Sequence, residues 1–197
     1  MLKDTGLRKI PVFYPTLWKM PEKLRFLKLS QNRMQEHETS LKGYDALLSA
    51  LGSTRKQEGS AEQFRRIDLN LNFEIAVLAR RAGVKHFGIV STQGANSKIP
   101  YLSFRLFHSL LYLKTKGELE EKLKTLEFSS LSIFRPGLLN RTRGKVRQSE
   151  RIAQFFLSGL PTAHLAKVMI EDAYRALESD IIGKNRIKIF EGQDFRR

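Results

Sequence analysis

The chain has 197 residues, of which 41% are hydrophobic, and it carries a formal net charge of +15 at pH 7. This length suits a single domain with a sizeable core, and the hydrophobic share lies well above the range of disordered chains. The absence of cysteine excludes disulfide frameworks and cysteine-based metal sites. The four scattered histidines lack metal-ligand spacing, so no metal site is expected.

Every apolar run in the sequence is too short to span a membrane, and no signal-peptide core stands at the start. The expected location is therefore the cytoplasm, without a transmembrane segment. Peripheral association with a membrane surface is left open by these observations.

The excess of basic residues favours attraction to nucleic acid, anionic lipid or an acidic partner. These residues are spread along the chain, and their densest runs cover residues 141–147 and 184–188. No recognisable nucleic-acid-binding module accompanies them, so a merely basic surface is favoured over nucleic-acid binding. The run at 141–147 could instead contact the phosphate of a bound cofactor.

Residues 1–43 show the weakest pattern in the chain. Two apolar runs, 9–14 and 24–29, predict short strands, and Pro11 makes the first of them an edge strand or no strand at all. A short helix is expected over residues 32–41, with Gly43 at its carboxyl end.

From residue 44 onward, patterns typical of strands and helices alternate. Apolar runs predict buried strands over residues 44–51 and 86–92 and two further strands over residues 131–134 and 186–190. Apolar residues at helical spacing predict helices over residues 61–82, 107–126, 149–158 and 162–179. Strands that alternate with long helices pair in parallel through right-handed crossovers. The sequence therefore predicts an α/β fold with a Rossmann-like, doubly wound parallel sheet.

The helix over residues 61–82 has clear ends and an unusual middle. Ser60 is a typical amino-terminal cap, and Gly83 follows the last turn. Asp68, Asn70 and Asn72 are poor helix formers within it. We expect such residues to be tolerated there if they face a ligand or solvent.

Small and polar residues follow three of the predicted strands directly. They are Gly52–Arg55, Ser91 and Thr92, and Pro136 and Gly137. Because ligands of such sheets bind at the carboxyl ends of the strands, we expect these three segments to line one crevice.

Tyr112 and Lys116 lie four residues apart, and hence on one face of the predicted helix over residues 107–126. An ammonium group nearby stabilises tyrosinate against the phenol by opposite charge, as proton transfer requires. The hydroxyl of Ser91, at the end of the preceding strand, would hold the substrate oxygen. This is the chemistry of hydride transfer between a nicotinamide and a carbonyl, although the Tyr-x-x-x-Lys pattern alone is common in Lys-rich helices.

Six segments carry a resemblance to a known family, and they occur in order along the chain. They are ALGSTR (50–55), FRRID (64–68), GVKHF (83–87), VSTQGA (90–95), YLKTKGE (112–118) and FRPGLL (134–139). With them, about residues 40–197 resemble the Tat-interacting oxidoreductase family. These are atypical short-chain dehydrogenases that include a fungal mitochondrial outer-membrane member.

The resemblance implies a fold that binds NADP(H) and a catalytic triad of Ser91, Tyr112 and Lys116. It also implies a set of residues that line the cofactor, namely Gly52, Ser53, Thr54, Arg55, Pro136, Gly137 and Leu138. Family members are described as binding partners in transcription and nuclear import. The nucleus and the surface of the mitochondrial outer membrane are therefore alternative locations to the cytoplasm.

The amino-terminal part departs from the family, which opens with a strand, a Gly-x-x-Gly-x-x-Gly turn and a helix. The only glycines before Gly52 are Gly6 and Gly43, and neither lies in such a turn. We therefore expect one Rossmann-like domain over residues 1–197 that is amino-terminally incomplete, with a divergent part at 1–43 and a family-like core at 44–197. The strand over residues 44–51 would then have an open edge, which either the run at 9–14 or at 24–29 fills or which stays poorly protected.

The segment between Ser91 and Tyr112 is also longer than in the family. Residues 99–108 form an apolar and basic insertion. It would either extend the following helix backward or displace Tyr112 from Ser91.

The sequence therefore predicts an NADP(H)-dependent oxidoreductase-like protein that acts on a small carbonyl or alcohol. Binding of NADP(H) is expected to be weak or absent, since the turn that receives the pyrophosphate at a helix amino terminus is missing. The alternative hypothesis is a non-catalytic Rossmann scaffold that binds a protein partner. A nucleic-acid-binding protein on the same scaffold is the least favoured hypothesis.

Overall fold

Four parallel strands form the centre of the computed structural model, which describes residues 34–53, 60–100, 108–140, 159–178 and 185–195. They are β1 (Ala46–Ser49), β2 (His86–Val90), β3 (Ser130–Arg135) and β6 (Arg186–Glu191), in the spatial order β1-β2-β3-β6. The predicted α/β fold with a parallel Rossmann-like sheet is confirmed. Within the described residues β1 lies at one edge of this sheet.

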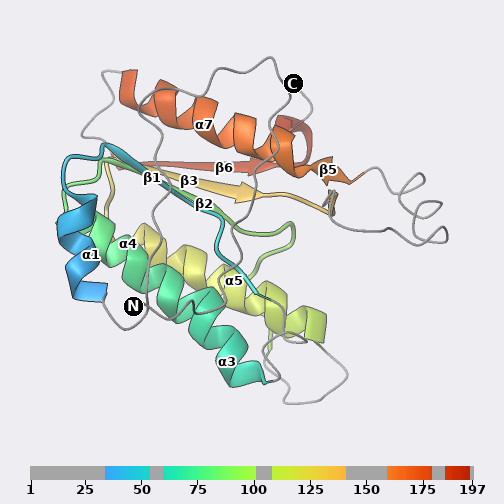
Figure 1. Cartoon of the computed structure of the whole chain (residues 1–197). Coiled ribbons are helices and arrows are strands. Elements are labelled where there is room, and N and C mark those ends of the chain that lie inside the picture. The colour runs from blue at the N-terminus through green and yellow to red at the C-terminus, as the bar shows by residue number, and fades with distance from the viewer. Residues whose placement is uncertain (1–33, 54–59, 101–107, 141–158, 179–184, 196–197) are drawn as a thin grey trace, which may run out of the picture.

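Helices cover both faces of the sheet (Figure 1). On one face lie α1 (Met34–Leu41), α5 (His108–Lys124) and a continuous helical segment made of α3 (Ala61–Arg65), the π-helix η2 (Arg66–Leu71) and α4 (Asn72–Arg81). On the other face lies α7 (Thr162–Glu178). The remaining elements are the two-residue strands β4 (Leu139–Asn140) and β5 (Leu160–Pro161) and the short 3-10 helix η3 (Gly192–Phe195).

Alternate residues of the strands divide the interior into two packed clusters. Phe87, Ile89, Leu131 and Ile133 are buried toward α4 and α5, where Phe87 stacks on Phe128 at 5.1 Å between ring centroids. The cluster on the α7 side consists of Phe134, Leu165, Met169, Phe190 and Phe195. Both faces of β2 and β3 are buried, and three of the buried residues, His86, Ser130 and Ser132, are polar.

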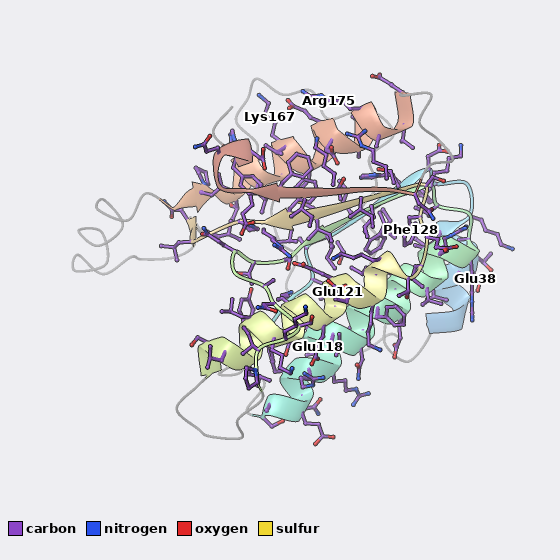
Figure 2. The ribbon with its side chains drawn as sticks, turned by 180° about the vertical axis from the view of Figure 1, so that it is seen from behind. Glu38, Glu118, Glu121, Phe128, Lys167 and Arg175 are labelled. Atoms are coloured by element: carbon purple, nitrogen blue, oxygen red, sulfur yellow. The ribbon has the colours of Figure 1, made fainter. Side chains whose placement is uncertain are left out.

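The two outer surfaces of these layers are rich in charge. From behind, Glu118 and Glu121 are seen on α5, and Lys167 and Arg175 on α7, beyond the opposite face of the sheet (Figure 2). Among the described residues, none of the helices has the length and apolar character needed to cross a membrane.

The helix ends agree with the sequence. Gly43 and Gly83 follow α1 and α4 with φ of +84° and +88°, a backbone conformation that glycine adopts without strain. Ser60 caps α3 by accepting a hydrogen bond from the backbone N–H of Gln63 at 3.1 Å.

The strand predicted over residues 44–51 is shorter and less buried than expected. β1 covers only Ala46–Ser49, and three of its four residues are half-buried because it lies at the sheet edge. The strands predicted at 9–14 and 24–29, the helix predicted at 149–158 and most of the insertion at 99–108 lie outside the described residues.

Candidate functional site

One face of α5 carries the polar groups of the site. Tyr112, Lys116 and Glu120 follow one another at intervals of four residues, so they lie along a single line of the helix. Lys116 reaches the carboxyl end of β1, and Glu120 reaches the carboxyl ends of β2 and β3, as the contacts below show.

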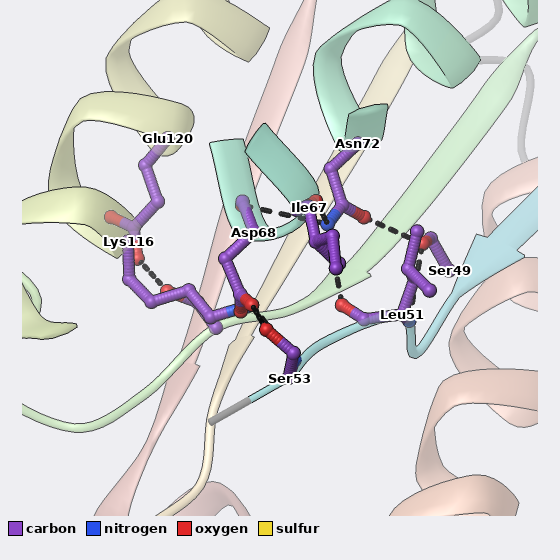
Figure 3. Close-up of polar contacts among 9 residues, drawn as sticks. Ser49, Leu51, Ser53, Ile67, Asp68, Asn72, Lys116 and Glu120 are labelled. Carbon is purple, nitrogen blue, oxygen red and sulfur yellow. Dashed lines mark hydrogen bonds and ion pairs between the residues drawn. The ribbon is translucent and has the colours of Figure 1, made fainter. Parts of the chain in front are cut away.

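Lys116 is paired with a buried carboxylate. Its Nζ lies 3.0 Å from Oδ1 of Asp68, and the two side chains are 3% and 0% exposed (Figure 3). The other oxygen of Asp68, Oδ2, accepts hydrogen bonds from the backbone N–H and the hydroxyl of Ser53, both at 2.7 Å. Asp68 therefore ties α5 to the loop that leaves β1.

Glycine at position 52 lies directly against this ion pair. A Cβ at Gly52 would lie 3.3 Å from Oδ1 of Asp68 and 3.6 Å from Nζ of Lys116. Any larger side chain would project against the two charged groups. The backbone at Gly52 thus stays open next to the lysine.

A π-helical turn places Asp68 at this position. The side-chain amide of Asn72 donates to the backbone carbonyls of Ile67, at 3.1 Å, and Asp68, at 3.5 Å. The same amide also donates to the carbonyl of Leu51 at 3.3 Å and accepts from the hydroxyl of Ser49 at 3.0 Å (Figure 3). Asn72 therefore fastens the widened turn to the end of β1. Turns of this kind are frequent at functional sites.

The expectation that the poor helix formers face a ligand or solvent holds for only one of the three. Asn70 is exposed, whereas Asp68 and Asn72 are fully buried and bond to the protein itself. The sequence alone did not indicate this role, because Asn72 bonds to a residue 21 positions earlier.

Ser91 is bonded to a second buried carboxylate. Its hydroxyl donates to Oε1 of Glu120, which is 2% exposed. Arg135 donates to the same carboxylate through Nε, at 3.1 Å to Oε1, and Nη2, at 2.5 Å to Oε2. The hydrogen bond to Glu120 raises the pKa of Arg135. The backbone N–H of Ser91 donates to the carbonyl of Phe134 at 2.7 Å, which fixes the start of this loop.

Tyr112 lies half-buried at the start of the polar line on α5. Its ring centroid is 6.0 Å from that of Phe64 and 6.0 Å from Nζ of Lys116. Within the described residues no side-chain hydrogen bond joins Ser91, Tyr112 and Lys116 to one another. The structure thus brings Tyr112 and Lys116 together and bonds Ser91 to Glu120 instead.

The loop after β2 is held against α5. The Nζ of Lys114 donates to the carbonyls of Ser97, at 3.0 Å, and Ile99, at 2.8 Å. A Cβ at Gly117 would lie 2.3 Å from the backbone nitrogen of Ser97, so the loop touches the helix backbone there. This close approach requires glycine in the middle of a helix.

The loops after β2 and β3 also meet. The backbone N–H of Gln93 donates to the carbonyl of Pro136 at 3.0 Å, and a Cβ at Gly137 would lie 3.0 Å from Oε1 of Gln93. Leu138 next to it is 61% exposed and offers apolar surface. Of the residues expected to line the cofactor, only Thr54 and Arg55 lie outside the described residues.

The sequence interpretation missed Asp68, Asn72, Glu120 and Arg135 as members of this site. Glu120 had a usable signal, since it continues the four-residue spacing from Tyr112. Its neighbours in the sequence are Lys and Glu residues typical of a solvated helix face, so the burial of Glu120 could not be predicted from them.

A protein-family model described as NAD(P)H-binding matches residues 17–173 of the chain. The chain is 39% identical over 137 residues to the protein named fmp52, mitochondrial, of Emericella nidulans, which covers 70% of this chain and 53% of that protein. It is 32% identical over 165 residues to Protein HTATIP2 of Rattus norvegicus, which covers 82% of this chain and 64% of that protein. The chain thus spans between half and two thirds of the length of these relatives. The resemblance to the Tat-interacting oxidoreductase family is confirmed.

Solved structures with low sequence identity share the fold. A putative NAD-dependent epimerase/dehydratase from Bacillus halodurans matches with a TM-score of 0.53 and 20% identity, over 79% of this chain and 68% of that one. A UDP-N-acetylglucosamine 4-epimerase from Bacillus cereus matches with a TM-score of 0.55 and 15% identity, over 82% and 60%.

Proposed function

Because the chain belongs to the NAD(P)H-binding family and to its atypical short-chain dehydrogenase branch, we propose that it is an NADP(H)-dependent oxidoreductase of a small carbonyl or alcohol. One observation carries the proposal. A single face of α5 reaches three strand ends, through Lys116 beside Gly52 and through Glu120 bonded to Ser91 and Arg135. Ligands of open α/β sheets bind at such strand ends.

The residues around Gly52 fit a nicotinamide cofactor. Lys116 has three N–H donors, and its ion pair with Asp68 leaves donors for a ribose hydroxyl or a phosphate. Gly52 and Ser53 would hold the cofactor from the β1 side, and the segment 136–138 would do so from the β3 side. When bound, the nicotinamide would supply the hydride to a carbonyl or accept it from an alcohol.

Tyr112 would move the proton to or from the substrate oxygen, and Ser91 would contact that oxygen. Lys116 lies 3.0 Å from a carboxylate oxygen of Asp68 but 6.0 Å from the centroid of the Tyr112 ring. Since Coulomb energy falls with distance, Asp68 balances most of the lysine charge. Lys116 would therefore act first as a ligand-holding group and only second as a support for the tyrosinate.

We further propose that NADP(H) binds weakly to this 197-residue chain. The family's glycine turn is not among the residues before Gly52, so backbone N–H groups at a first helix would not hold the pyrophosphate. Losing two or three charge-assisted hydrogen bonds, at about 1.5–3 kcal/mol each, weakens binding by roughly a hundredfold or more.

Calorimetric titration with NADPH and NADH tests the proposal. The double variant Asp68→Asn/Lys116→Met replaces the ion pair with neutral groups, which buried pairs often tolerate. We expect it to bind NADPH less tightly than the original chain. Lys122→Met, an exposed change on the same helix, should leave the affinity unchanged. Equal affinities for both variants would contradict the assigned cofactor site.

A non-catalytic scaffold that binds a protein partner is the second candidate. It is favoured because both groups already bind buried carboxylates of the protein: Ser91 is bonded to Glu120, and Lys116 is paired with Asp68. The proton of Ser91 and the charge of Lys116 then have partners without any ligand. Failure of both nicotinamide cofactors to bind would put this candidate first. The fungal relatives are named mitochondrial, so a mitochondrial location is an alternative to the cytoplasm for this chain, and cell fractionation would decide between them.

A further inference from the structure

The hydroxyl of Ser91 can point its proton in only one direction in this structure. Both oxygens of Glu120 accept hydrogen bonds from Arg135, a guanidinium that is always charged. A carboxylate paired in this way is ionised and can only accept. Ser91 must therefore be the donor in its bond to Glu120.

A serine hydroxyl has one proton and two lone pairs. Glu120 takes the proton, so only the lone pairs of Ser91 are left for anything that enters the site. A ketone or aldehyde oxygen has no proton to give to them. An alcohol has one.

We propose that Glu120 is a positioning residue that turns the Ser91 hydroxyl into a hydrogen-bond acceptor, so that the group held at Ser91 is the alcohol form of the substrate. This inference rests on the proposed function and specifies its ligand. It also changes the role of Ser91, which would not donate to a carbonyl oxygen. Arg135 supports the arrangement because its Nε and Nη2 fix both oxygens of Glu120.

The substitution Glu120→Gln should weaken the hold on the Ser91 proton. Oε1 of Glu120 accepts from both Ser91 and Nε of Arg135, whereas Oε2 accepts from Nη2 alone, so the single oxygen of Gln belongs at the Oε1 position. Ser91 then donates to a neutral amide oxygen, which is a weaker acceptor than a carboxylate. The serine proton is therefore turned into the site more easily than in the original chain.

The first test is the hydroxyl proton of Ser91 itself, observed by NMR on the complete chain. A hydroxyl bonded to a buried carboxylate should give a slowly exchanging, downfield proton signal. We expect this signal in the original chain and in Thr92→Val, which removes the neighbouring hydroxyl. It should vanish in Ser91→Ala and move upfield in Glu120→Gln. The exposed change Glu121→Gln, on the same helix and with the same loss of charge, should leave it in place.

The second test compares cyclohexanol with cyclohexanone, titrated separately onto the same proteins. The ratio of alcohol to ketone affinity should fall by roughly tenfold in Glu120→Gln and stay constant in Glu121→Gln, because a neutral amide oxygen holds the Ser91 proton less strongly than a carboxylate does. A ratio unchanged in Glu120→Gln would overturn the inference. So would the absence of the hydroxyl signal from the original chain, which needs no variant to fold. If neither compound binds, the proposed carbonyl and alcohol site fails, and the hydroxyl signal alone decides the direction of the Ser91 bond.

Discussion

Lys116 and Asp68 form an ion pair with 3.0 Å between Nζ and Oδ1, and both side chains are almost completely buried. Removing one partner of such a pair leaves the other charge without compensation in a medium of low polarity. Asp68 also receives both hydrogen bonds from Ser53, so the pair holds the loop after β1 as well as α5.

The first prediction concerns this pair. Asp68→Asn should lower the free energy of unfolding by about 3–5 kcal/mol, the range for breaking one side of a buried ion pair. Urea unfolding measures the loss. The exposed change Glu62→Gln at the start of α3 is the control and should cost less than about 0.5 kcal/mol. Adding Lys116→Met to Asp68→Asn should recover part of this loss. If the double variant instead lost the sum of the two single losses in unfolding free energy, the pairing would be contradicted.

The second prediction concerns the π-helical turn. Asn72→Ala removes an amide that bonds to Leu51, Ile67, Asp68 and Ser49. We expect a loss of about 2–4 kcal/mol, since buried polar groups of the backbone and of Ser49 lose their partner. Asn70→Ala, two residues earlier and exposed, is the matched control and should change stability by less than about 0.5 kcal/mol. If the two variants unfold at the same urea concentration, the hydrogen bonds of Asn72 make no net contribution to stability.

The third prediction is a pH dependence that comes from His86 at the start of β2. Burial lowers the pKa of His86 from 6.5 to about 4, although Asp172 opposes this shift and Arg186 adds to it. The ring is fully buried, with Nδ1 at 3.1 Å from the hydroxyl of Ser130 and Nε2 at 3.9 Å from Oδ2 of Asp172. Above pH 6.5 the ring is neutral in both the folded and the unfolded chain.

As the pH falls below 6.5, the unfolded chain takes up a proton that the folded chain refuses. The free energy of unfolding should therefore fall between pH 6.5 and 4, by about 3 kcal/mol in all and about 2 kcal/mol at pH 5. His86→Gln should remove this component. The two proteins then differ in the slope of unfolding free energy against pH, and this difference isolates the contribution of His86 from those of the other histidines. Equal slopes would mean that His86 takes up its proton equally readily in both states.

The sequence predicted the layers of the fold because their signals are local. The apolar runs at β2, β3 and β6 and the glycines after α1 and α4 needed no knowledge of the distant chain. The half-buried state of β1 depends on its place at the sheet edge, which an apolar run does not reveal. The same holds for Glu120, whose burial depends on Arg135, fifteen residues further along and on another element.

The candidate site was accessible from the sequence only in part. The spacing of Tyr112 and Lys116 predicted their shared helix face, and the structure places them there. The partners that hold Ser91 and Lys116 were not predicted, since carboxylates in a charged helix ordinarily face water. The functional roles of Ser91, Tyr112 and Lys116 stay predictions, and the last experiment addresses the central one.

The fourth prediction concerns Tyr112, the proton-transfer group of the proposed reaction. Tyr112→Phe removes the hydroxyl but keeps the ring that packs 6.0 Å from Phe64, so the fold should be unaffected. Turnover of a carbonyl substrate should fall by about 10²–10⁴-fold, the usual contribution of a positioned acid or base. Cofactor affinity should stay within about threefold, since the lysine and the loop after β1 are untouched.

Tyr174→Phe is the matched control for this experiment. Tyr174 lies on α7, beyond the opposite face of the sheet, and is 40% exposed. Losing its hydroxyl should change neither turnover nor stability. Both rates are best measured with NADPH in excess, so that weak cofactor binding does not mask the chemical step. If Tyr112→Phe turns over as fast as Tyr174→Phe, Tyr112 is not the proton-transfer group. Loss of the hydroxyl that carries the proton must slow the reaction, whereas loss of a hydroxyl elsewhere should not.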